Sequence, residues 1–442
     1  MKAAFRQPGF GFLFFGLLAS MAGDSLMLIV LAIWVKDLTG SNGAAGLTFF
    51  FLAAPALLAP LAGVYVDRLR RRTVLLWGNV ASALAVLPLV LVRSADQVWL
   101  IYLVAVLYGV SFVVLPAALN GLLKEMLPEE LLVDANASLS TSKEALRLVG
   151  PLAGAGLFTL LGGAGVAVVD AASFVVAAVV IGFLPVREEQ PVREEGHWRD
   201  EFLAGVRHIR SDRVLTHTLL ATGLSLLVIG FMESAVFAMV DAFGKPASYV
   251  GVVVSVQGVG AIAGGVTSSR VIRRLGETSA IALSLVILAL GLAICAVAPS
   301  LAAVFVGVVV VGYALPVFIV AFNTLLQLRT PQRLMGRVSA ATDVVLGTPQ
   351  ATSIAVGALL VSVISFRDIF WICVAVILAA AAYLVLVLRR PGPSKATAPA
   401  PNQDCGEASA GSGVETRAPA VSPPFPFEPA GTDTDVGGPP AA

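Results

Sequence analysis

The ten-residue stretch Gly63–Arg72, GVYVDRLRRR, returns as Gly265–Arg274, GVTSSRVIRR, at a distance of 202 residues. Both copies keep a glycine and three arginines, but the aspartate of the first copy is a serine in the second. A second pair of segments, residues 109–128 and 312–331, shares a glycine, an asparagine, two leucines and a proline at a distance of 203. Two matches at nearly one distance indicate that the chain consists of two homologous halves.

The composition indicates that lipid surrounds most of the chain. Hydrophobic residues make up 57% of its 442 residues and charged residues 13%, whereas an average soluble protein carries roughly 25% charged residues. A mean hydropathy of +0.90 is more than the cores of soluble domains of this total length can hide. The basic residues lie in short segments between long apolar runs, which excludes the contiguous basic face of a nucleic-acid-binding protein.

Runs of about 20 apolar residues predict membrane-spanning helices. Both matching segments lie on the same side of the membrane in each half, so the halves share one topology and form a parallel repeat. The predicted fold class is therefore an all-α membrane protein with two six-helix bundles. Its twelve predicted spans are 9–35, 44–66, 73–92, 98–118, 134–161, 164–184, 214–240, 248–268, 279–298, 301–322, 338–364 and 368–389.

The distribution of basic residues predicts the orientation. If the N-terminus is cytoplasmic, the outer segments contain only Lys36, Arg93, Lys245 and Arg367, and 29 minus these four leaves 25 basic residues on the inner side. The positive-inside rule then predicts a multi-pass protein of the inner (cytoplasmic) membrane with both termini in the cytoplasm.

Composition also predicts the domain boundaries. The connector contains an amphipathic segment, Phe202–Ile209, that is expected to lie along the membrane face or to be an ordinary solvated linker. The tail is rich in Pro, Ala, Gly and Ser, which predicts disorder. The predicted parts are an N-terminal bundle at 1–186, a cytoplasmic linker at 187–213, a C-terminal bundle at 214–390 and a cytoplasmic tail at 391–442.

The sequence does not support an enzyme. Its three cysteines and three histidines form no disulfide framework, metal-ligand spacing or nucleophile motif. No ATP-binding motif is present, so no cofactor is expected and an ion gradient or the gradient of the substrate itself must supply the energy.

The stretch Gly63–Arg72 resembles the signature between the second and third helices of the major facilitator superfamily, and the resemblance extends over about residues 5–390. It implies a secondary active transporter that works as a functional monomer, with membrane lipid and a small-molecule substrate as its partners, no nucleic acid, and a proton gradient as its energy source. Several segments further resemble the branch that holds macrolide-efflux and enterobactin exporters, namely Gly23-Asp24, Asp134–Ala137, Arg147 to Pro151, Asp170–Phe174 and Asn323–Gln327.

The resemblance implies a gate at the signature. Asp67 is expected to reach the N-terminal end of the eleventh helix near Arg337, where unpaired N–H groups attract an anion. The arginines are expected to bind acidic side chains or lipid phosphates, or to act only as topology signals. The gating residues are Gly63, Asp67, Arg68, Arg71 and Arg72, and the second copy, Gly265, Arg270, Arg273 and Arg274, lacks the acid and so predicts an asymmetric gate.

Four acids lie within predicted spans, where a charge costs about 3 kcal/mol at the helix centre and calls for a partner or a function. Counting residues from the helix ends places Asp24 and Glu233 in the outer part of the membrane core, Asp170 nearer its outer rim and Asp343 in its inner part. Asp24 and Glu233 lie in the first helix of each half. Either could bind a proton in one state and release it in the other, because burial favours a neutral carboxyl and water a charged one.

The fifth span carries a cation and a kink motif. A buried Arg147 needs a carboxylate, either Glu144 on the same helix or Asp24 across the cavity; a static pair or a snorkelling arginine is the alternative. The following residues Gly150, Pro151 and Gly154 resemble the glycine-proline motif of superfamily antiporters, which favours export. An ordinary kinked packing helix is equally compatible with them.

Few polar residues remain to bind a substrate, and Gln257, Asn323 and Gln350 are the candidates. A sparsely polar cavity suits a hydrophobic or amphipathic compound, such as a drug, an antibiotic or a siderophore-like molecule, better than a sugar or a nucleotide. The sequence therefore predicts export of such a compound by proton antiport. Uptake of a metabolite and a non-transporting sensor or scaffold on the same fold are the alternatives.

Overall fold

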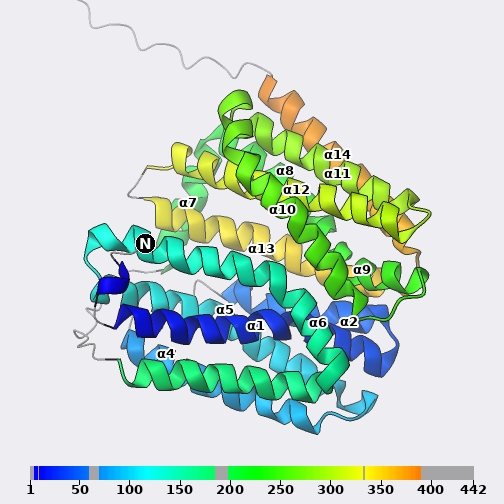
Figure 1. Cartoon of the computed structure of the whole chain (residues 1–442). Helices are drawn as coiled ribbons and strands as arrows, with labels where there is room; N and C mark the ends of the chain where they lie inside the picture. The colour runs from blue at the N-terminus through cyan, green and yellow to red at the C-terminus, as the bar shows by residue number, and fades with distance from the viewer. Residues whose placement is uncertain (1–3, 8, 59–68, 185–197, 332–333, 390–442) are drawn as a thin grey trace, which may run out of the picture. The chain divides into compact units, whose positions relative to one another are not determined.

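A computed structural model describes residues 4–7, 9–58, 69–184, 198–331 and 334–389, all within one compact unit. Every regular element in these residues is a helix (Figure 1). The first half contains η1 (Ala4–Arg6), α1 (Phe10–Thr39), α2 (Asn42–Ala53), η2 (Ala54–Leu58), α4 (Arg71–Val86), η3 (Leu87–Leu91), η4 (Ala95–Gln97), α5 (Val98–Met126) and α6 (Glu129–Gly182). The rest contains α7 (Trp198–Ser211), α8 (Arg213–Ile229), α9 (Phe231–Ala242), α10 (Tyr249–Leu275), α11 (Glu277–Val297), α12 (Leu301–Arg329), α13 (Met335–Leu360) and α14 (Phe366–Arg389).

Ten of the helices in these ranges are long and apolar enough to cross a membrane, judged by length and composition. The predicted all-helical membrane fold is thereby confirmed. The segment Asn42–Leu57 is a shorter apolar helix and covers the start of the predicted span 44–66, whose remainder lies outside the described residues. The number of twelve crossings therefore stays a prediction. The same holds for the predicted disorder of the tail 391–442, which lies outside the described residues.

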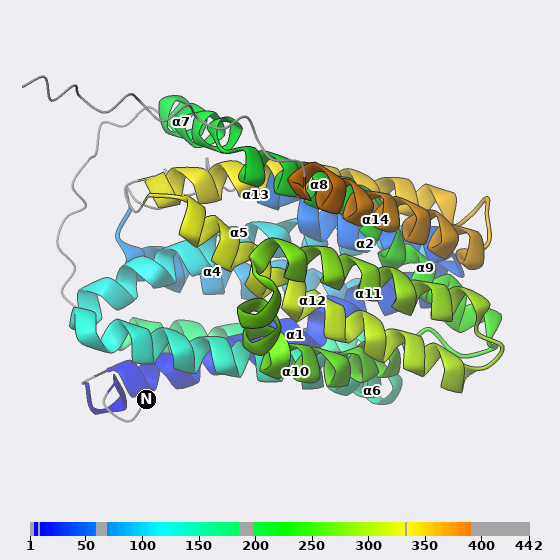
Figure 2. The ribbon, with the colours of Figure 1, turned by 90° about the horizontal axis from the view of Figure 1, so that it is seen from above.

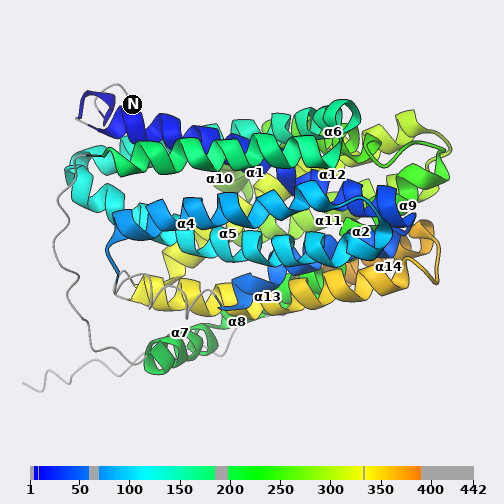
Figure 3. The ribbon, with the colours of Figure 1, turned by 90° about the horizontal axis from the view of Figure 1, so that it is seen from below.

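Helix α6 contains two predicted spans in one element. Its 54 residues would form a rod of about 80 Å at 1.5 Å per residue, against a hydrocarbon layer of about 30 Å. The helix breaks at Gly162, whose φ of 69° and ψ of 175° lie outside the helical region and favour glycine. The chain reverses there into two arms (Figures 1 and 3), in agreement with the separate spans 134–161 and 164–184.

The predicted span 214–240 is divided at Gly230 into α8 and α9. Gly230 packs closely against Ser353 and the backbone of Ile354 in α13. The amphipathic segment of the connector is helical, as predicted, and forms part of α7. Gly205 of α7 packs against the Arg337 carbonyl of α13, so α7 is attached to the second half.

Equivalent glycines of the two halves make equivalent helix contacts. Gly109 of α5 packs against the Leu52 carbonyl at the end of α2, and Gly312 of α12 packs against the Gln257 carbonyl of α10. These partners lie 205 residues apart, close to the distance between the sequence repeats. The internal duplication is therefore also a duplication of helix packing, in which α5 and α2 correspond to α12 and α10.

The halves meet along two sets of helices, α2 against α13 and α9, and α6 against α10. We call the face at which α1 begins the terminal face and the opposite face, near the end of α9, the distal face (Figures 2 and 3). Several close approaches between the halves lie toward the distal face, where Gly43 meets the Ala358 carbonyl, Gly46 meets Ser234 and Gly251 meets Pro151. Small residues permit such approach of helix backbones in lipid.

Helix α1 lies between the two arms of α6, and this is the most extensive helix contact in the described residues. Gly150 and Gly154 of the first arm pack against Ser25 and Leu26 of α1. Gly23 of α1 packs against Ser173 of the second arm. Glycines on both partners thus let α1 approach both arms.

Replacing Gly154 with alanine should destabilise the protein, because the new Cβ would collide with the Leu26 carbonyl. Overpacking of this kind typically costs about 1–3 kcal/mol. The apparent melting temperature of the purified protein in detergent should therefore fall. Gly156→Ala is the matched control, since a Cβ there meets open space and alanine favours a helix by about 1 kcal/mol over glycine. Equal melting temperatures for the two variants would contradict the packing described.

Candidate functional site

The first part of the gating signature, Gly63, Asp67 and Arg68, lies outside the described residues. Its last two arginines begin α4, and each is held by hydrogen bonds. Arg71 donates to Glu125 of α5, an acidic side chain of the kind predicted. Arg72 donates to the Ile181 carbonyl at 3.1 Å and to the Gly182 carbonyl, at the C-terminal end of α6 where a cation is favoured.

The second copy of the signature is built differently. Gly265 is exposed and a side chain there would meet open space. Arg270, Arg273 and Arg274 are exposed in the last two turns of α10. The copies therefore differ in their contacts as well as in the missing acid, since Arg71 and Arg72 are bonded to neighbouring helices.

The kink motif lies where three helices meet. Pro151 is inside the first arm of α6, and its carbonyl packs against Gly251 of α10 in the other half. Ser255 of α10 also donates a hydrogen bond to the Leu148 carbonyl at 3.4 Å. Gly150 and Gly154 instead contact α1 of the same half. The motif therefore serves packing within the first half and between the halves.

Arg147 is not the buried guanidinium that the sequence predicts. Its side chain is 67% exposed and lies 3.9 Å from Glu144, which is 64% exposed. Its charge also attracts Glu233 of α9 in the other half. The predicted pairing with Glu144 is thus present, whereas the alternative pairing with Asp24 is not among the contacts described. The acid of the other half on which its charge acts is Glu233.

Asp24 has a different neighbour. The strongest charge acting on it is that of Asp170 on the second arm of α6, ahead of Lys143 on the first arm. Asp170 is completely buried and beside Gly23 of α1. Asp170 therefore lies level with the middle of α1. This is deeper than the outer rim at which counting residues places it, because the second arm of α6 does not begin at the level where α1 ends.

The remaining candidates are spread over the second half. Asp343 and Gln350 are exposed on α13, Asn323 is exposed on α12, and Gln257 is half-buried on α10. None of these four side chains makes a hydrogen bond that brings it to another candidate in the described residues. Their grouping as one substrate site stays a prediction.

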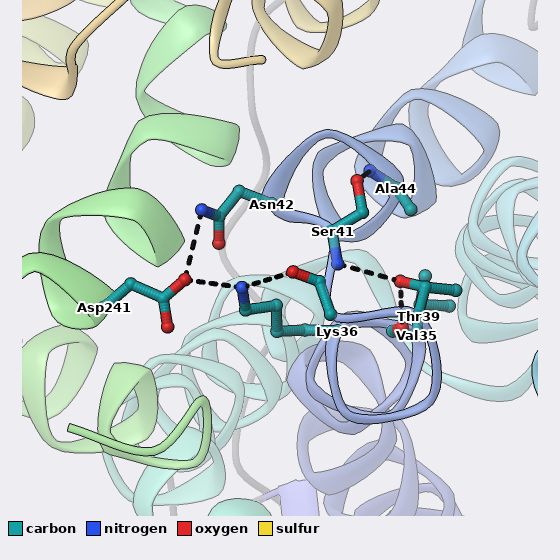
Figure 4. Close-up of polar contacts among 8 residues, drawn as sticks. Val35, Lys36, Thr39, Ser41, Asn42, Ala44 and Asp241 are labelled. Atoms are coloured by element: carbon teal, nitrogen blue, oxygen red, sulfur yellow. Dashed lines mark hydrogen bonds and ion pairs between the residues drawn. The ribbon is translucent and has the colours of Figure 1, made fainter. Parts of the chain in front are cut away.

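A polar network joins the halves at the distal face (Figure 4). Lys36, near the end of α1, donates to Asp241 of α9 at 2.5 Å and to the Gly40 carbonyl at 2.8 Å. Asn42 of α2 donates to the same Asp241 oxygen at 3.2 Å. Gly40 ends α1 with a φ of 68°, a conformation that favours glycine. The network therefore attaches the α1–α2 turn of one half to α9 of the other.

Sequence reasoning missed this ion pair, although a signal was present. Lys36 and Asp241 lie 205 residues apart, close to the register of the duplication, so they are opposite charges at equivalent places in the two halves. Lys36 is 10% exposed and Asp241 44% exposed. A partly exposed pair of this kind contributes about 1 kcal/mol or less.

A cavity of about 560 Å³ opens at the distal face between the halves. It is lined by the end of α1, the bend of α6 and the turn Pro246–Ser248 of the second half, with Asp37 and Arg93 among its polar residues. None of the site residues predicted from the sequence lines it. Within the described ranges, no group of three or more His, Cys, Asp or Glu side chains is placed to hold a metal ion.

Residues 13–351 match the sequence pattern of the Major Facilitator Superfamily. The chain belongs to this superfamily. The match covers most of the chain and both halves of the duplication, so the predicted family and its transporter fold are confirmed. Membership of the superfamily also agrees with the absence of an enzyme motif in the sequence.

Two curated superfamily proteins are similar along much of their length. The chain is 26% identical over 344 residues to the multidrug efflux pump Tap of Mycolicibacterium fortuitum, which covers 73% of this chain and 82% of that protein. It is 28% identical over 268 residues to the uncharacterized MFS-type transporter YfiS of Bacillus subtilis (strain 168). That second match covers 59% of this chain and 63% of YfiS, slightly less than two thirds.

Solved superfamily structures share the fold at low identity. A bacterial homologue of the iron transporter ferroportin in its inward-facing state gives a TM-score of 0.70 at 17% identity, over 86% of this chain and 99% of that one. Its outward-facing state gives 0.58 at 19% identity, over 86% and 100%. The nucleoside transporter NupG gives 0.68 at 13% identity, over 87% and 100%.

Breaking the distal ion pair should open the distal face more often. Lys36→Met and Asp241→Asn each remove about 1 kcal/mol of closing energy, which is about fivefold in an equilibrium. Spin labels placed at Asp96 and Ala242 would report the distance between the halves by pulsed electron resonance. The longer-distance population should grow in both variants.

The charge swap Lys36→Asp with Asp241→Lys should restore the wild-type distance distribution, while Arg93→Met, which removes an exposed distal cation outside this network, should leave it unchanged. Identical distributions in wild type and both single variants would show that the pair does not hold the distal face closed.

Proposed function

We propose that this superfamily member exports a hydrophobic or amphipathic small molecule by alternating access, in exchange for protons. The observation that carries the proposal is that Arg147 of α6 and Glu233 of α9 belong to different halves and lie close enough for the charge of Arg147 to act on Glu233. A charge pair that spans two rocking halves changes its environment whenever they move. Such a change is what couples a proton or a charged group to alternating access.

The exposure of this pair supports a water-accessible path between the halves. Arg147 and Glu144 are each about two-thirds exposed, although they lie in a helix that crosses the membrane. Leaving such charges in lipid costs about 3 kcal/mol each at the bilayer centre. Because the charge of Arg147 also acts on Glu233 of the other half, water between the halves is the solvent that we infer for this charge.

The distal network supports closure on one side of this path. Glu233 precedes Asp241 by eight residues on α9, which is about 12 Å along a helix. The Arg147–Glu233 pair therefore lies on the terminal side of the Lys36–Asp241 ion pair. With Lys36, Arg93, Lys245 and Arg367 at the distal ends of their helices, the positive-inside rule favours a cytoplasmic terminal face. Closure at the distal face then corresponds to an inward-facing state. In agreement, the TM-score with the ferroportin homologue is higher for its inward-facing state, 0.70, than for its outward-facing state, 0.58.

The direction of transport is supported by two observations. The relative matched over 73% of this chain is a multidrug efflux pump. The kink motif at Gly150 and Pro151 joins α1, the first arm of α6 and α10, so a change of the kink would act on both halves together. These observations and the apolar composition of the spans support the proposal that a sparsely polar compound is exported.

Asp24→Asn and Glu233→Gln should each abolish proton-driven transport, since the first removes an acid that can bind the coupling proton and the second removes the acid on which the charge of Arg147 acts across the halves. The full-length protein in proteoliposomes would be tested with ethidium and a macrolide antibiotic as probes under an imposed pH gradient. Transport should fall to the level of protein-free vesicles, while exchange of the probe at equal pH on both sides is retained.

Asp368→Asn provides the control, because this acid is exposed at the start of α14 and is distant in sequence from both Asp24 and Glu233. Undiminished proton-driven transport in both test variants would end the assignment of these acids to proton coupling. Accumulation of the probes under the opposite gradient would favour uptake over export.

A further inference from the structure

Two acids from different helices meet in the middle of the first half. Asp24 is half-buried at the centre of α1, and Asp170 is completely buried on the second arm of α6. Their backbones approach closely because Gly23 has no side chain, and a Cβ there would collide with the Oδ1 atom of Asp170 and with Ser173. The Oδ1 atom therefore points toward α1, beside Asp24.

The buried carboxylate is hydrogen-bonded on one side only. Tyr108 of α5 donates its hydroxyl hydrogen to the Oδ2 atom of Asp170. The Oδ1 atom is equally buried and has no hydrogen-bond partner, since the nearby Ser173 hydroxyl donates to the backbone carbonyl of Asp170 at 2.7 Å. The tyrosine ring packs edge-on against Phe112 and Phe174, at centroid distances of 5.6 and 5.9 Å. Asp170 is thus completely buried beside these rings, while Asp24 is half-buried and keeps some exposed surface.

An unpartnered buried carboxylate oxygen is costly, and a second carboxylate beside it makes full ionisation of both still less favourable. Lys143 is the cation that acts on Asp24, but it is exposed and its effect is smaller than that of Asp170. The charged and titratable groups that face the pair are thus Lys143 on the first arm of α6 and Tyr108 on α5. Neither supplies a donor to Oδ1. A proton bound to one of the two carboxyl groups supplies that donor.

We propose that Asp24 and Asp170 together form the proton-binding site of this transporter, holding one proton between them, and that Tyr108 positions Asp170 to receive it. The proposal rests on proton antiport as the function. It separates the proton site, inside the first half, from the Arg147–Glu233 pair between the halves. No bond other than the O–H bond to the bound proton forms or breaks, and the proton leaves to water through Asp24.

A hydrogen bond links the two sites. Ser25, the neighbour of Asp24, donates to the carbonyl of Leu146, the neighbour of Arg147, at 2.7 Å. Gly150, one turn further along α6, packs against the same serine. Movement of α1 on gain or loss of the proton is therefore transmitted to the segment that carries Arg147.

A proton fits this site better than a metal ion. Hard divalent cations take six or more oxygen ligands, and the described residues place no third acid, histidine or cysteine with this pair. One oxygen of Asp170 is already occupied by the hydroxyl hydrogen of Tyr108. A single proton satisfies the remaining oxygen without further ligands.

Infrared difference spectroscopy of the purified full chain in lipid tests the proposal without a substrate. During a pH titration, the C=O band of protonated carboxyls assigned to the pair should grow in two separate steps. In Asp24→Asn and in Asp170→Asn one step should disappear and the other should move by about one pH unit or more, because interacting acids titrate as a pair. In both single variants an unmoved remaining step would show that the acids titrate independently and overturn the proposal.

Tyr108→Phe keeps both acids and removes only the hydroxyl, so it tests positioning even if an aspartate variant folds poorly. It should keep both steps but shift the frequency of the C=O band, because one hydrogen bond to Asp170 is lost; an unchanged frequency would overturn the role of Tyr108. Asp368→Asn should leave the steps and the frequency unchanged.

Three further outcomes test this proposal, and the last two separate it from the proposed function. Stoichiometric Mn²⁺ binding by calorimetry that is lost in Asp170→Asn would overturn the proton assignment in favour of a metal site. Coupled titration without any proton-driven transport would refute antiport and leave the paired site standing. Proton-driven transport with independent titration of the two acids would refute the paired site alone.

Discussion

The packing of α1 between the two arms of α6 is the contact on which both parts of the candidate site depend. Lipid offers no hydrophobic driving force between helices, so their association relies on close van der Waals packing and hydrogen bonds. Glycines supply that closeness here, on the first arm at Gly150 and Gly154 and on α1 at Gly23. The same contacts place Asp24 beside Asp170 and tie Ser25 to Leu146. A single helix thereby connects the pair Asp24 and Asp170 to the segment that packs against the other half.

The two halves repeat the same packing but differ in their charges. Gly109 and Gly312 make equivalent contacts, whereas the arginines of the first signature are bonded to neighbouring helices and those of the second are exposed. At the distal face the two halves carry opposite charges, and Lys36 of one half forms an ion pair with Asp241 of the other. Duplication thus provides two bundles of one shape, and divergence of a few charged positions provides the contacts that can open and close between them.

Much of the fold could be predicted because the membrane imposes simple length and polarity rules. Helices begin at Phe10, Val98, Tyr249 and Leu301, each within about one residue of a predicted span start, although several of them extend beyond the predicted span at the other end. The predicted span 214–240 corresponds to one candidate crossing, Arg213–Ala242, within which the helix is interrupted at Gly230 where it packs against Ser353. The exposure of Arg147 was mispredicted, because a membrane-embedded position was equated with burial in protein.

The sequence by itself determined the family, the duplication, the helical class and the identity of the costly charges, because these follow from composition, spacing and the price of a charge in lipid. Only the tertiary structure decided which charges meet. Asp170 lies beside Asp24 and accepts a hydrogen bond from Tyr108, Lys36 is bonded to Asp241, and the charge of Arg147 acts on Glu233. Each of these pairings joins helices that are distant in sequence, and their relative rotation and depth depend on backbone approach at glycines. Hydropathy and helical periodicity carry no information about that approach.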